Sequence, residues 1–404
     1  VVVGYGVQKK SDVTGAMARV GEKELKAMPV RNALEGMQGK TAGVDITSSQ
    51  RPGEVGNINI RGQRSINAEQ GPLYVVDGMV IQNGGIENIN PSDIEAIDIL
   101  KDASATAIYG SRGANGVILV TTKKGKEGKV TLNYSGTVTF ETLHDVTEMM
   151  SATEWLDYAR LAKYNAGSYA SATPTFEADK AAFGSVSASW KNIEQAWSNG
   201  NYDPSKVGSY DWASHGKQTG ITHEHTLSAS GGSDKFQGYA SFGYLDQKGT
   251  QPGQAYERYT LKTSFDVTPV DWFKMGSSIN ASYSTQDYGY SFSKSVTGSG
   301  DFYSALRSMI PWTVPYDENG EYVRYPSGDV NIINPIRELD YNTNQRRTFR
   351  ASASMYSQID FGKIWKPLEG LSYRLQFGPE FQFYTLGVAN AADGINGDGN
   401  NGAQ

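Results

Sequence analysis

The stretch KVTLNYSGTVTFE, residues 129–141, alternates apolar and polar side chains along its length. The apolar face runs from Val130 to Phe140 and the polar face from Thr131 to Glu141. Because successive side chains of a strand point to opposite faces, this period of two predicts a β-strand. The same period, in places shorter or less regular, recurs at residues 227–230, 236–244, 259–267, 273–284, 349–361 and 371–377. The chain from residue 128 onward is therefore predicted to form seven antiparallel strands.

The connections between these strands alternate in predicted length. Short turns are expected at residues 231–234, 268–271 and around Trp365, and long connections at about 142–223, 246–256 and 286–346. Strict alternation would place the short turns at one end, as in an outer-membrane barrel with periplasmic turns and extracellular loops. Trp272 and Trp365 would then lie at the turns, where membrane-interface aromatic residues are expected. A soluble sandwich of two sheets also shows alternation, so it stays open as an alternative.

Residues 1–127 mix short helix and strand signals and are predicted to form a small α+β domain, separate from the barrel part at 128–404. Asn32 is a favourable N-cap for a short helix over residues 33–39, and Asp102 for one over 103–109. Asp77-Gly78 supplies the positive φ angles of a two-residue hairpin turn. Single-chain bacterial barrels have an even number of strands, so we expect residues 128–404 to be the first part of a longer barrel.

The composition of the 404-residue chain disfavours several classes of protein. The 37 Lys and Arg against 43 Asp and Glu give a net charge of −6, which argues against nucleic acid as a partner. The lack of cysteine excludes disulfides, thiolate nucleophiles and cysteine-bound zinc. His223 and His225 share a strand face without a third ligand nearby in sequence, and no nucleophile stands with a base and an orienting group. We therefore predict no metal, no cofactor and no enzymatic activity.

Four motifs in the first 125 residues carry a family resemblance. They are VVVGYGVQKK at residues 1–10, NIRGQR at 59–64, PLYVVDG at 72–78 and LKDASATAIYGSRGANGVI at 100–118. In this order they closely resemble the plug domain of the TonB-dependent transporters of the SusC/RagA type. The signature positions among them are Asp77, Gly78, Lys101, Asp102, Tyr109, Gly110, Arg112 and Gly113.

The resemblance implies a membrane β-barrel of about 22 antiparallel strands with the α+β plug inside its lumen. It places the protein in the outer membrane of a Gram-negative bacterium, in the Bacteroidetes. It implies active import of oligosaccharides, energised by TonB and the inner-membrane complex, with a SusD-like surface lipoprotein as a lid. Import of oligopeptides by the same mechanism is the alternative. A siderophore or cobalamin receptor is a nearer rival, and a secreted β-rich glycan-binding protein is the rival from another class.

The resemblance also implies roles for individual residues. Val1, Val2 and Val3 resemble the segment that TonB contacts, which would add a strand to an exposed edge of TonB. Arg61, with Arg64 in the same motif, resembles the plug arginine that pairs with carboxylates of the barrel wall. From the residues themselves, Trp155 and Trp312 are candidates for stacking on sugar rings, with ordinary packing of a partly helical loop as the alternative.

Overall fold

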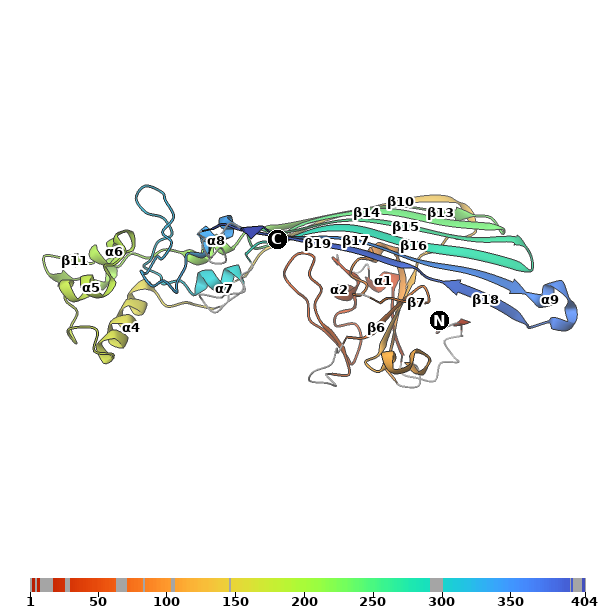
Figure 1. Cartoon of the computed structure of the whole chain (residues 1–404), viewed down its shortest axis with the longest axis horizontal. Coiled ribbons are helices and arrows are strands. Elements are labelled where there is room, and N and C mark those ends of the chain that lie inside the picture. Colours follow the sequence, from red (N-terminus) through yellow and green to blue (C-terminus); the bar gives the residue numbers. More distant parts are fainter. Residues whose placement is uncertain are drawn as a thin grey trace.

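The computed structural model describes residues 2–3, 6–7, 17–25, 30–62, 71–82, 84–102, 106–144, 147–290, 301–392, 394 and 402–403. Three units are visible in Figure 1: a long curved sheet, a compact unit against one face of it, and a helical unit at one end. We call the sheet the wall, the compact unit at residues 17–122 the plug, and the helical unit at 147–219 and 301–341 the loop domain. Among the described residues, no helix has the length and apolar character needed to cross a membrane.

The wall is an antiparallel sheet whose strands follow one another in chain order. Its strands are β10 (Gly128–Glu141), β13 (Gly220–Gly232), β14 (Phe236–Lys248), β15 (Gln254–Val270), β16 (Phe273–Tyr288), β17 (Asn342–Asp360), β18 (Ser372–Phe377), β19 (Glu380–Asn390) and β20 (Gly402–Ala403). Because β18 and β19 both pair with β17, they act as one interrupted strand. Counted in this way, seven wall strands precede β20, at the seven segments that the alternation predicts.

One predicted connection of the wall is wrong. The chain between β14 and β15 turns within residues 249–253 instead of forming a long loop over 246–256. The reason is that strand pairing continues beyond the clear alternation, with Gln247 opposite Tyr256 and Lys248 opposite Ala255. The connections at 233–235, 271–272 and 361–371 lie at the end of the wall opposite the loop domain, and the last of them contains α9 (Phe361–Ile364) and the 3₁₀ helix η6 (Lys366–Leu368).

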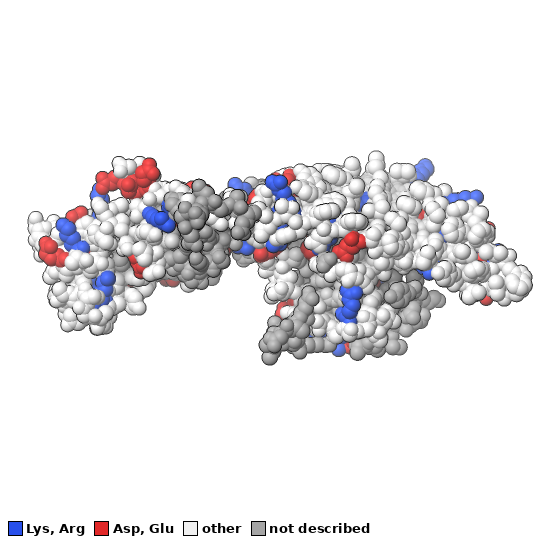
Figure 2. Space-filling view, in the orientation of Figure 1, with Lys and Arg blue, Asp and Glu red and all other residues white. Residues whose placement is uncertain are grey.

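The two faces of the wall differ in polarity: the inner face is polar and the outer face is apolar, the reverse of a sheet in a soluble protein. The face toward the plug buries polar side chains, including Thr226, Ser241, Gln247, Thr260, Lys262, Ser278, Ser282 and Gln286. The other face exposes large apolar side chains, including Leu132, Leu227, Phe242, Leu261, Tyr283, Phe349 and Phe383. The visible wall surface is largely uncharged, whereas acidic side chains gather on the loop domain (Figure 2). A polar inside and an apolar outside are typical of a barrel in a lipid bilayer and argue against the soluble sandwich.

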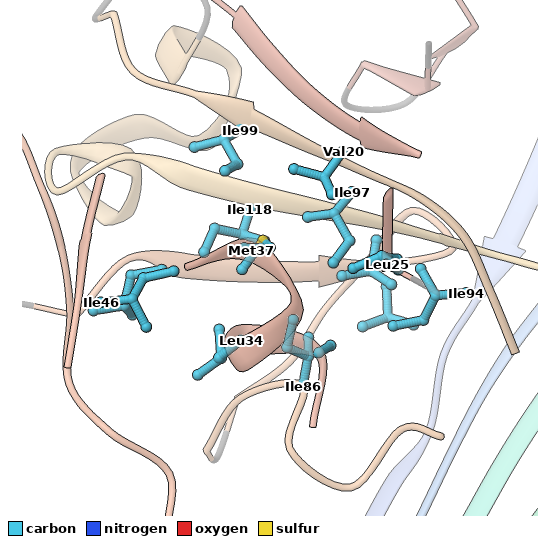
Figure 3. Close-up of a cluster of buried hydrophobic side chains, with 14 of the residues drawn as sticks. Val20, Leu25, Leu34, Met37, Ile46, Ile86, Ile94, Ile97, Ile99 and Ile118 are labelled. Atoms are coloured by element: carbon cyan, nitrogen blue, oxygen red, sulfur yellow. The ribbon is translucent and has the colours of Figure 1, made fainter. Parts of the chain in front are cut away.

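The plug is a five-stranded sheet covered by short helices. Its strand order is β3 (Met17–Gly21), β8 (Ile94–Leu100), β9 (Val117–Thr122), β6 (Leu73–Val76) and β7 (Met79–Val80). The other elements are α1 (Glu22–Leu25), α2 (Ala33–Met37), η2 (Pro91–Asp93), η3 (Ala107–Gly113) and the β4 (Val44–Ile46) and β5 (Ile58–Ile60) pair. Figure 3 shows Leu34 and Met37 of α2 packed against Ile97 and Ile118 of the sheet. These apolar contacts hold the plug together as a unit with its own core.

Local signals in the plug are largely realised. Asn32 caps α2 and accepts a hydrogen bond from the backbone N–H of Glu35. Asp77 and Gly78 join β6 to β7 with φ angles of 49° and 84°, as the hairpin turn requires. Of the helix predicted at 103–109, residues 103–105 lie outside the described residues. From Ala107 onward the chain forms the 3₁₀ helix η3, kinked at Gly110 where φ is 59°.

The loop domain is built from both long connections of the wall. It contains α4 (Ala152–Asn165), α5 (Phe176–Phe183), α6 (Ser187–Glu194), the β11 (Trp197–Ser198) and β12 (Asn201–Tyr202) pair, η4 (Pro204–Lys206), η5 (Trp212–Gly216), α7 (Phe302–Arg307) and α8 (Pro335–Tyr341). Leu156 and Ile193 from the first connection pack with Ile310 and Trp312 from the second. A second cluster joins Trp212 of the first connection to Phe302 and Ile336 of the second. The two loops therefore share their buried apolar clusters and stand as a unit beyond the end of the wall (Figure 1).

Candidate functional site

The Asp77-Gly78 turn of the plug is inserted against the wall. The Asp77 carboxylate accepts hydrogen bonds from the backbone N–H of Thr122 at 2.9 Å and from the Ser278 hydroxyl of β16 at 2.7 Å. The Lys262 ammonium of β15 lies 3.8 Å from the same carboxylate and donates to the hydroxyls of Thr122 and Ser278. One buried carboxylate therefore joins a plug strand to two wall strands.

The backbone of the same turn contacts two further wall strands. The Asp77 carbonyl accepts hydrogen bonds from Ser354 of β17 at 3.1 Å and from Gln376 of β18 at 3.3 Å. A side chain at Gly78 would come within 3.0 Å of the Gln376 amide, and its φ of 84° also favours glycine. The Asp-Gly pair therefore serves both the turn and its fit against the wall.

The charge state of Asp77 depends on its neighbours. Burial by itself raises the pKa of this carboxyl group, but the Lys262 ammonium and the hydrogen bonds from Thr122 and Ser278 outweigh burial. The resulting pKa lies below the ordinary value. Asp77 is therefore ionised at neutral pH and forms a buried, hydrogen-bonded ion pair with Lys262.

A second set of plug–wall contacts centres on Glu87. Its carboxylate pairs with Arg350 of β17 at 3.2 Å, and its backbone carbonyl accepts from Arg258 of β15 at 2.8 Å. Arg258 also lies 3.7 Å from Glu224 of β13. Close by, Arg31 of the plug pairs with Glu141 of β10 at 3.4 Å, so in this part of the interface arginines come from both the wall and the plug.

The predicted plug arginines lie elsewhere. Arg61 forms an ion pair with Asp102, which belongs to the plug, and its side chain is 46% exposed. Arg64 lies outside the described residues. In the structure the carboxylate partner of Arg61 thus lies within the plug. Contact of Arg61 with the barrel wall stays a prediction.

The segment that links the plug to the wall passes directly against strand β14. A Cβ atom at Gly125 would lie 2.3 Å from the backbone nitrogen of Gly238 in β14, so the two segments are in backbone-to-backbone contact. Next to it, Lys124 lies 3.8 Å from Asp266 of β15 and over the ring of Tyr356. These contacts anchor the end of the plug to the wall.

Other signature residues hold the plug itself. Lys101 donates to the backbone carbonyl of Ala42, and Arg112 donates to the Gln82 side chain at 3.1 Å. Tyr109 packs against the buried cluster that contains Leu100 and Leu119. A Cβ at Gly113 would meet the carbonyl oxygen of Thr106 at 2.9 Å, and Gly110 makes the kink of η3. These residues shape the plug and do not form a reactive centre.

The N-terminal segment is described only in part. Val2 and Val3 form β1 (Val2–Val3), which pairs with β2 (Gly6–Val7). Val1 lies outside the described residues. An extended segment is compatible with strand addition to TonB, and the contact itself stays a prediction.

Trp155 and Trp312 meet edge to face, with ring centroids 5.6 Å apart. Both belong to the core of the loop domain, and Trp312 is only 4% exposed. The packing alternative therefore describes Trp312 in this structure, because contact of its ring with a sugar would require the core to open. Aromatic side chains that are exposed on this domain include Tyr158 and Tyr164 of α4.

No sequence motif marks the wall residues Arg258, Lys262 and Arg350 as plug contacts. They occupy polar-face positions of β15 and β17 among short polar side chains. The signal in the sequence is a long charged side chain on the polar face of a strand, because a charge that is buried there needs a partner.

Comparisons with known proteins agree with this architecture. Residues 9–117 match the TonB-dependent Receptor Plug Domain. The chain is 33% identical over 380 residues to TonB-dependent receptor P39 of Formosa agariphila, covering 93% of this chain and 33% of that protein. It is 29% identical to TonB-dependent receptor SusC of Bacteroides thetaiotaomicron, covering 98% of this chain and 37% of that protein. The RagAB peptide importer in its open-open state superposes with a TM-score of 0.76 at 26% identity, covering 96% of this chain and 43% of that one.

The chain belongs to the TonB-dependent transporters of the SusC/RagA type. It spans about a third of the length of the curated relatives it matches. Transporters of this type are outer-membrane β-barrels of Gram-negative bacteria, and the apolar outer face of the wall agrees with this location. They are not enzymes. The fold is the plug with part of the barrel wall.

Proposed function

We propose that this SusC/RagA-type protein imports oligosaccharides across the outer membrane, driven by TonB and working with a SusD-like surface lipoprotein. The observation that carries the proposal is a plug held in a wall of polar lining by hydrogen bonds and ion pairs, as at Asp77 and Glu87. Such contacts can be exchanged for contacts with water at less cost than those of a packed apolar core.

The proposed mechanism gives one step each to the loop domain, the plug and the N-terminal segment. Substrate binds between the loop domain and the plug, and its preference for one plug conformation makes the segment at Val1, Val2 and Val3 accessible on the opposite side. TonB adds a strand to this segment and transmits force to the plug. The SusD-like lipoprotein closes over the loop domain and retains the substrate.

Oligopeptides are the second candidate substrate. Support comes from the likeness to the RagAB peptide importer, at 26% identity over nearly the whole chain. Hydroxyl, amide and charged groups of the polar wall face suit the hydrogen-bonding groups of either class of oligomer. The two candidates share the transport mechanism and differ in the substrate that the loops select.

Uptake by intact cells tests the proposal. Cells with the full-length gene receive labelled pools of oligosaccharides or oligopeptides, with and without TonB, and with and without the proton gradient. TonB-dependent uptake of an oligosaccharide pool is expected, and uptake of only the peptide pool would establish the second candidate. Binding without energised uptake would contradict import.

A further inference from the structure

The outer face of the wall changes character near the loop domain. Directly paired positions of neighbouring strands form a row of aromatic side chains there: His225, Tyr244, Tyr259, Tyr283, Phe349 and Phe383. The row two residues nearer the loop domain is polar: His223, Asp246, Glu257, Thr285, Arg347 and Thr385. We call them the aromatic row and the polar row.

The position of the aromatic row fits the edge of a bilayer. From this row to the row of Phe273, the described outer-face positions of the wall carry no Asp, Glu, Lys or Arg. On β16 the stretch from Tyr283 to Phe273 is about 33 Å along the strand. At a tilt of about 40° it covers about 25 Å of bilayer, the height of the apolar band of outer-membrane barrels. The polar row therefore lies at the level of the lipid headgroups.

Two carboxylates form the centre of the polar row. Asp246 of β14 stands opposite Glu257 of β15, and its Oδ2 lies 3.1 Å from Nε2 of His223. Oε1 of Glu257 accepts hydrogen bonds from the hydroxyls of Tyr244 at 3.1 Å and Tyr259 at 2.8 Å. The second oxygen of each carboxylate has no hydrogen-bond partner among the described residues. Each can therefore accept a hydrogen bond from a group outside the chain.

Aromatic rings surround these carboxylates. The ring centroids of Tyr244 and Tyr259 lie 5.0 Å apart, and the His223 ring lies 6.0 Å from Tyr244 and 5.8 Å from His225. Tyr134 of β10 extends the group, because its hydroxyl lies 2.8 Å from Nδ1 of His225. Exposed aromatic faces beside carboxylate acceptors match the two kinds of surface on a sugar, its C–H faces and its hydroxyl groups.

We propose that this surface binds the sugar headgroup of a glycolipid in the outer leaflet of the membrane. We call it the sugar patch, and it consists of Tyr134, His223, His225, Tyr244, Asp246, Glu257 and Tyr259.

A lipid is the occupant because the patch continues directly into the apolar face of the wall. Phe242 and Leu261, opposite each other, are the next outer-face residues after Tyr244 and Tyr259, so acyl chains can follow them. A sugar suits the patch better than a bare phosphate, since two carboxylates repel an anion but accept hydrogen bonds from hydroxyl groups. Binding of this lipid needs neither TonB nor a transported substrate.

Lipid competition tests the proposal. The purified full-length receptor is equilibrated in micelles with equal amounts of phosphatidylethanolamine, phosphatidylglycerol and a neutral diglucosyl diacylglycerol, and the lipids that stay bound are counted by mass spectrometry. We expect the diglucosyl lipid to be enriched. Phosphatidylglycerol carries a phosphate without a sugar, so its equal enrichment would overturn the proposal, as would no enrichment of the diglucosyl lipid.

Glu257→Gln removes the charged acceptor and keeps the size of the side chain. The enrichment is expected to fall about tenfold, as for the loss of one hydrogen bond to a charged group. Asp287→Asn is the matched control, because Asp287 is an outer-face carboxylate one row nearer the loop domain and accepts from Gln345 at 2.8 Å. Unchanged enrichment in Glu257→Gln, or an equal fall in Asp287→Asn, would contradict recognition by the sugar patch.

A chelator separates direct recognition of the sugar from bridging by a divalent cation. The enrichment is expected to persist in EDTA, because the carboxylates accept directly from the hydroxyl groups. Its loss in EDTA would show that a cation joins the receptor to the lipid, and the proposal would fail.

Spin labels check the depth of the two rows independently, since this chain has no cysteine of its own. Nitroxides are attached at Leu261→Cys and Thr285→Cys in the receptor reconstituted into vesicles. We expect the first label to be reached by oxygen dissolved in the hydrocarbon and the second by a water-soluble nickel chelate. A label at Thr285→Cys that only oxygen reaches would place the polar row inside the hydrocarbon and overturn the proposal.

Discussion

Asp77 joins the plug to the wall through both its side chain and its backbone. The carboxylate contacts Lys262 and Ser278, and the carbonyl accepts from Ser354 and Gln376. The side chains of Asp77 and Lys262 are 6% and 2% exposed, so neither charge has water to replace its partner. Loss of one member would leave the other charged and buried, which is the costly case for an ion pair.

Asp77→Asn removes the charge and keeps a residue that tolerates the positive φ of this turn. We expect it to weaken plug docking by about 3 kcal/mol because the Lys262 ammonium loses its counter-charge. Protection of the plug from protease in the purified receptor measures this change. Asp77→Asn/Lys262→Met is the control, because it leaves no unpaired charge and should recover part of the loss. Equal protection of the wild type and Asp77→Asn would contradict the buried pair.

The lowered pKa of Asp77 predicts the direction of a pH effect. A carboxyl group whose pKa falls on docking contributes stability above its ordinary pKa of 3.8, and this contribution is lost as the pH falls through the lowered value. For Asp77 we therefore expect an unchanged contribution to plug protection between about pH 8 and pH 5, and loss only in strong acid. The difference in protection between wild type and Asp77→Asn, measured across this range, isolates Asp77. A difference that shrinks between pH 7 and pH 5 would refute the assignment.

At the scale of elements, the loop domain is held by one buried carboxylate. Asp179 of α5 accepts from Arg160 of α4 at 2.9 Å, from Tyr169 at 2.7 Å and from Trp197 of β11 at 3.0 Å. Burial and the Asp179 carboxylate raise the pKa of Tyr169, so its hydroxyl stays a donor. Three elements thus meet at a fully buried side chain.

Asp179→Asn places an amide N–H₂ among these donors and leaves the Arg160 charge without its buried partner. We expect the loop domain to lose roughly 3–5 kcal/mol, measured by hydrogen exchange of α4 and α5. Asp157→Asn is the matched control, since Asp157 also pairs with Arg160 but is 61% exposed. An exposed pair contributes about 1 kcal/mol or less, so similar losses in both variants would rule out a central role for Asp179.

At the scale of the whole molecule, the apolar outer face of the wall indicates that this face lies against lipid. Leu261 of β15 is 51% exposed on the apolar face, whereas its neighbour Lys262 is buried against the plug. In water the exposed position would tolerate a charge, but in a bilayer it would not.

Leu261→Lys is therefore expected to destabilise the inserted receptor by about 2–4 kcal/mol, measured by folding into lipid vesicles. Val330→Lys is the control, because Val330 is 66% exposed in the loop domain, outside the wall. A Leu261→Lys receptor as stable as the control would argue against lipid on this face.

Much of the fold could be predicted because its signals are local. The period of two marks each wall strand, and the Asp77-Gly78 pair marks its hairpin through φ preferences that need no distant partner. The strand ends around residues 246–256 differ from the prediction because pairing with a neighbour, and not alternation, extends β14 and β15. The role of Trp312 was equally out of reach, since an aromatic residue in a loop packs or binds according to its surroundings.

The antiparallel strands, the separate plug and the family resemblance can all be recognised in the sequence, since these depend on spacing and on short motifs. The groups that hold the plug in the wall become apparent only in the folded chain. Asp77 is 201 residues from Ser278 and 299 from Gln376, and Glu87 finds Arg350 across 263 residues. No local preference encodes such pairs, because they arise when the wall curves around the plug and buried charges must find partners in three dimensions.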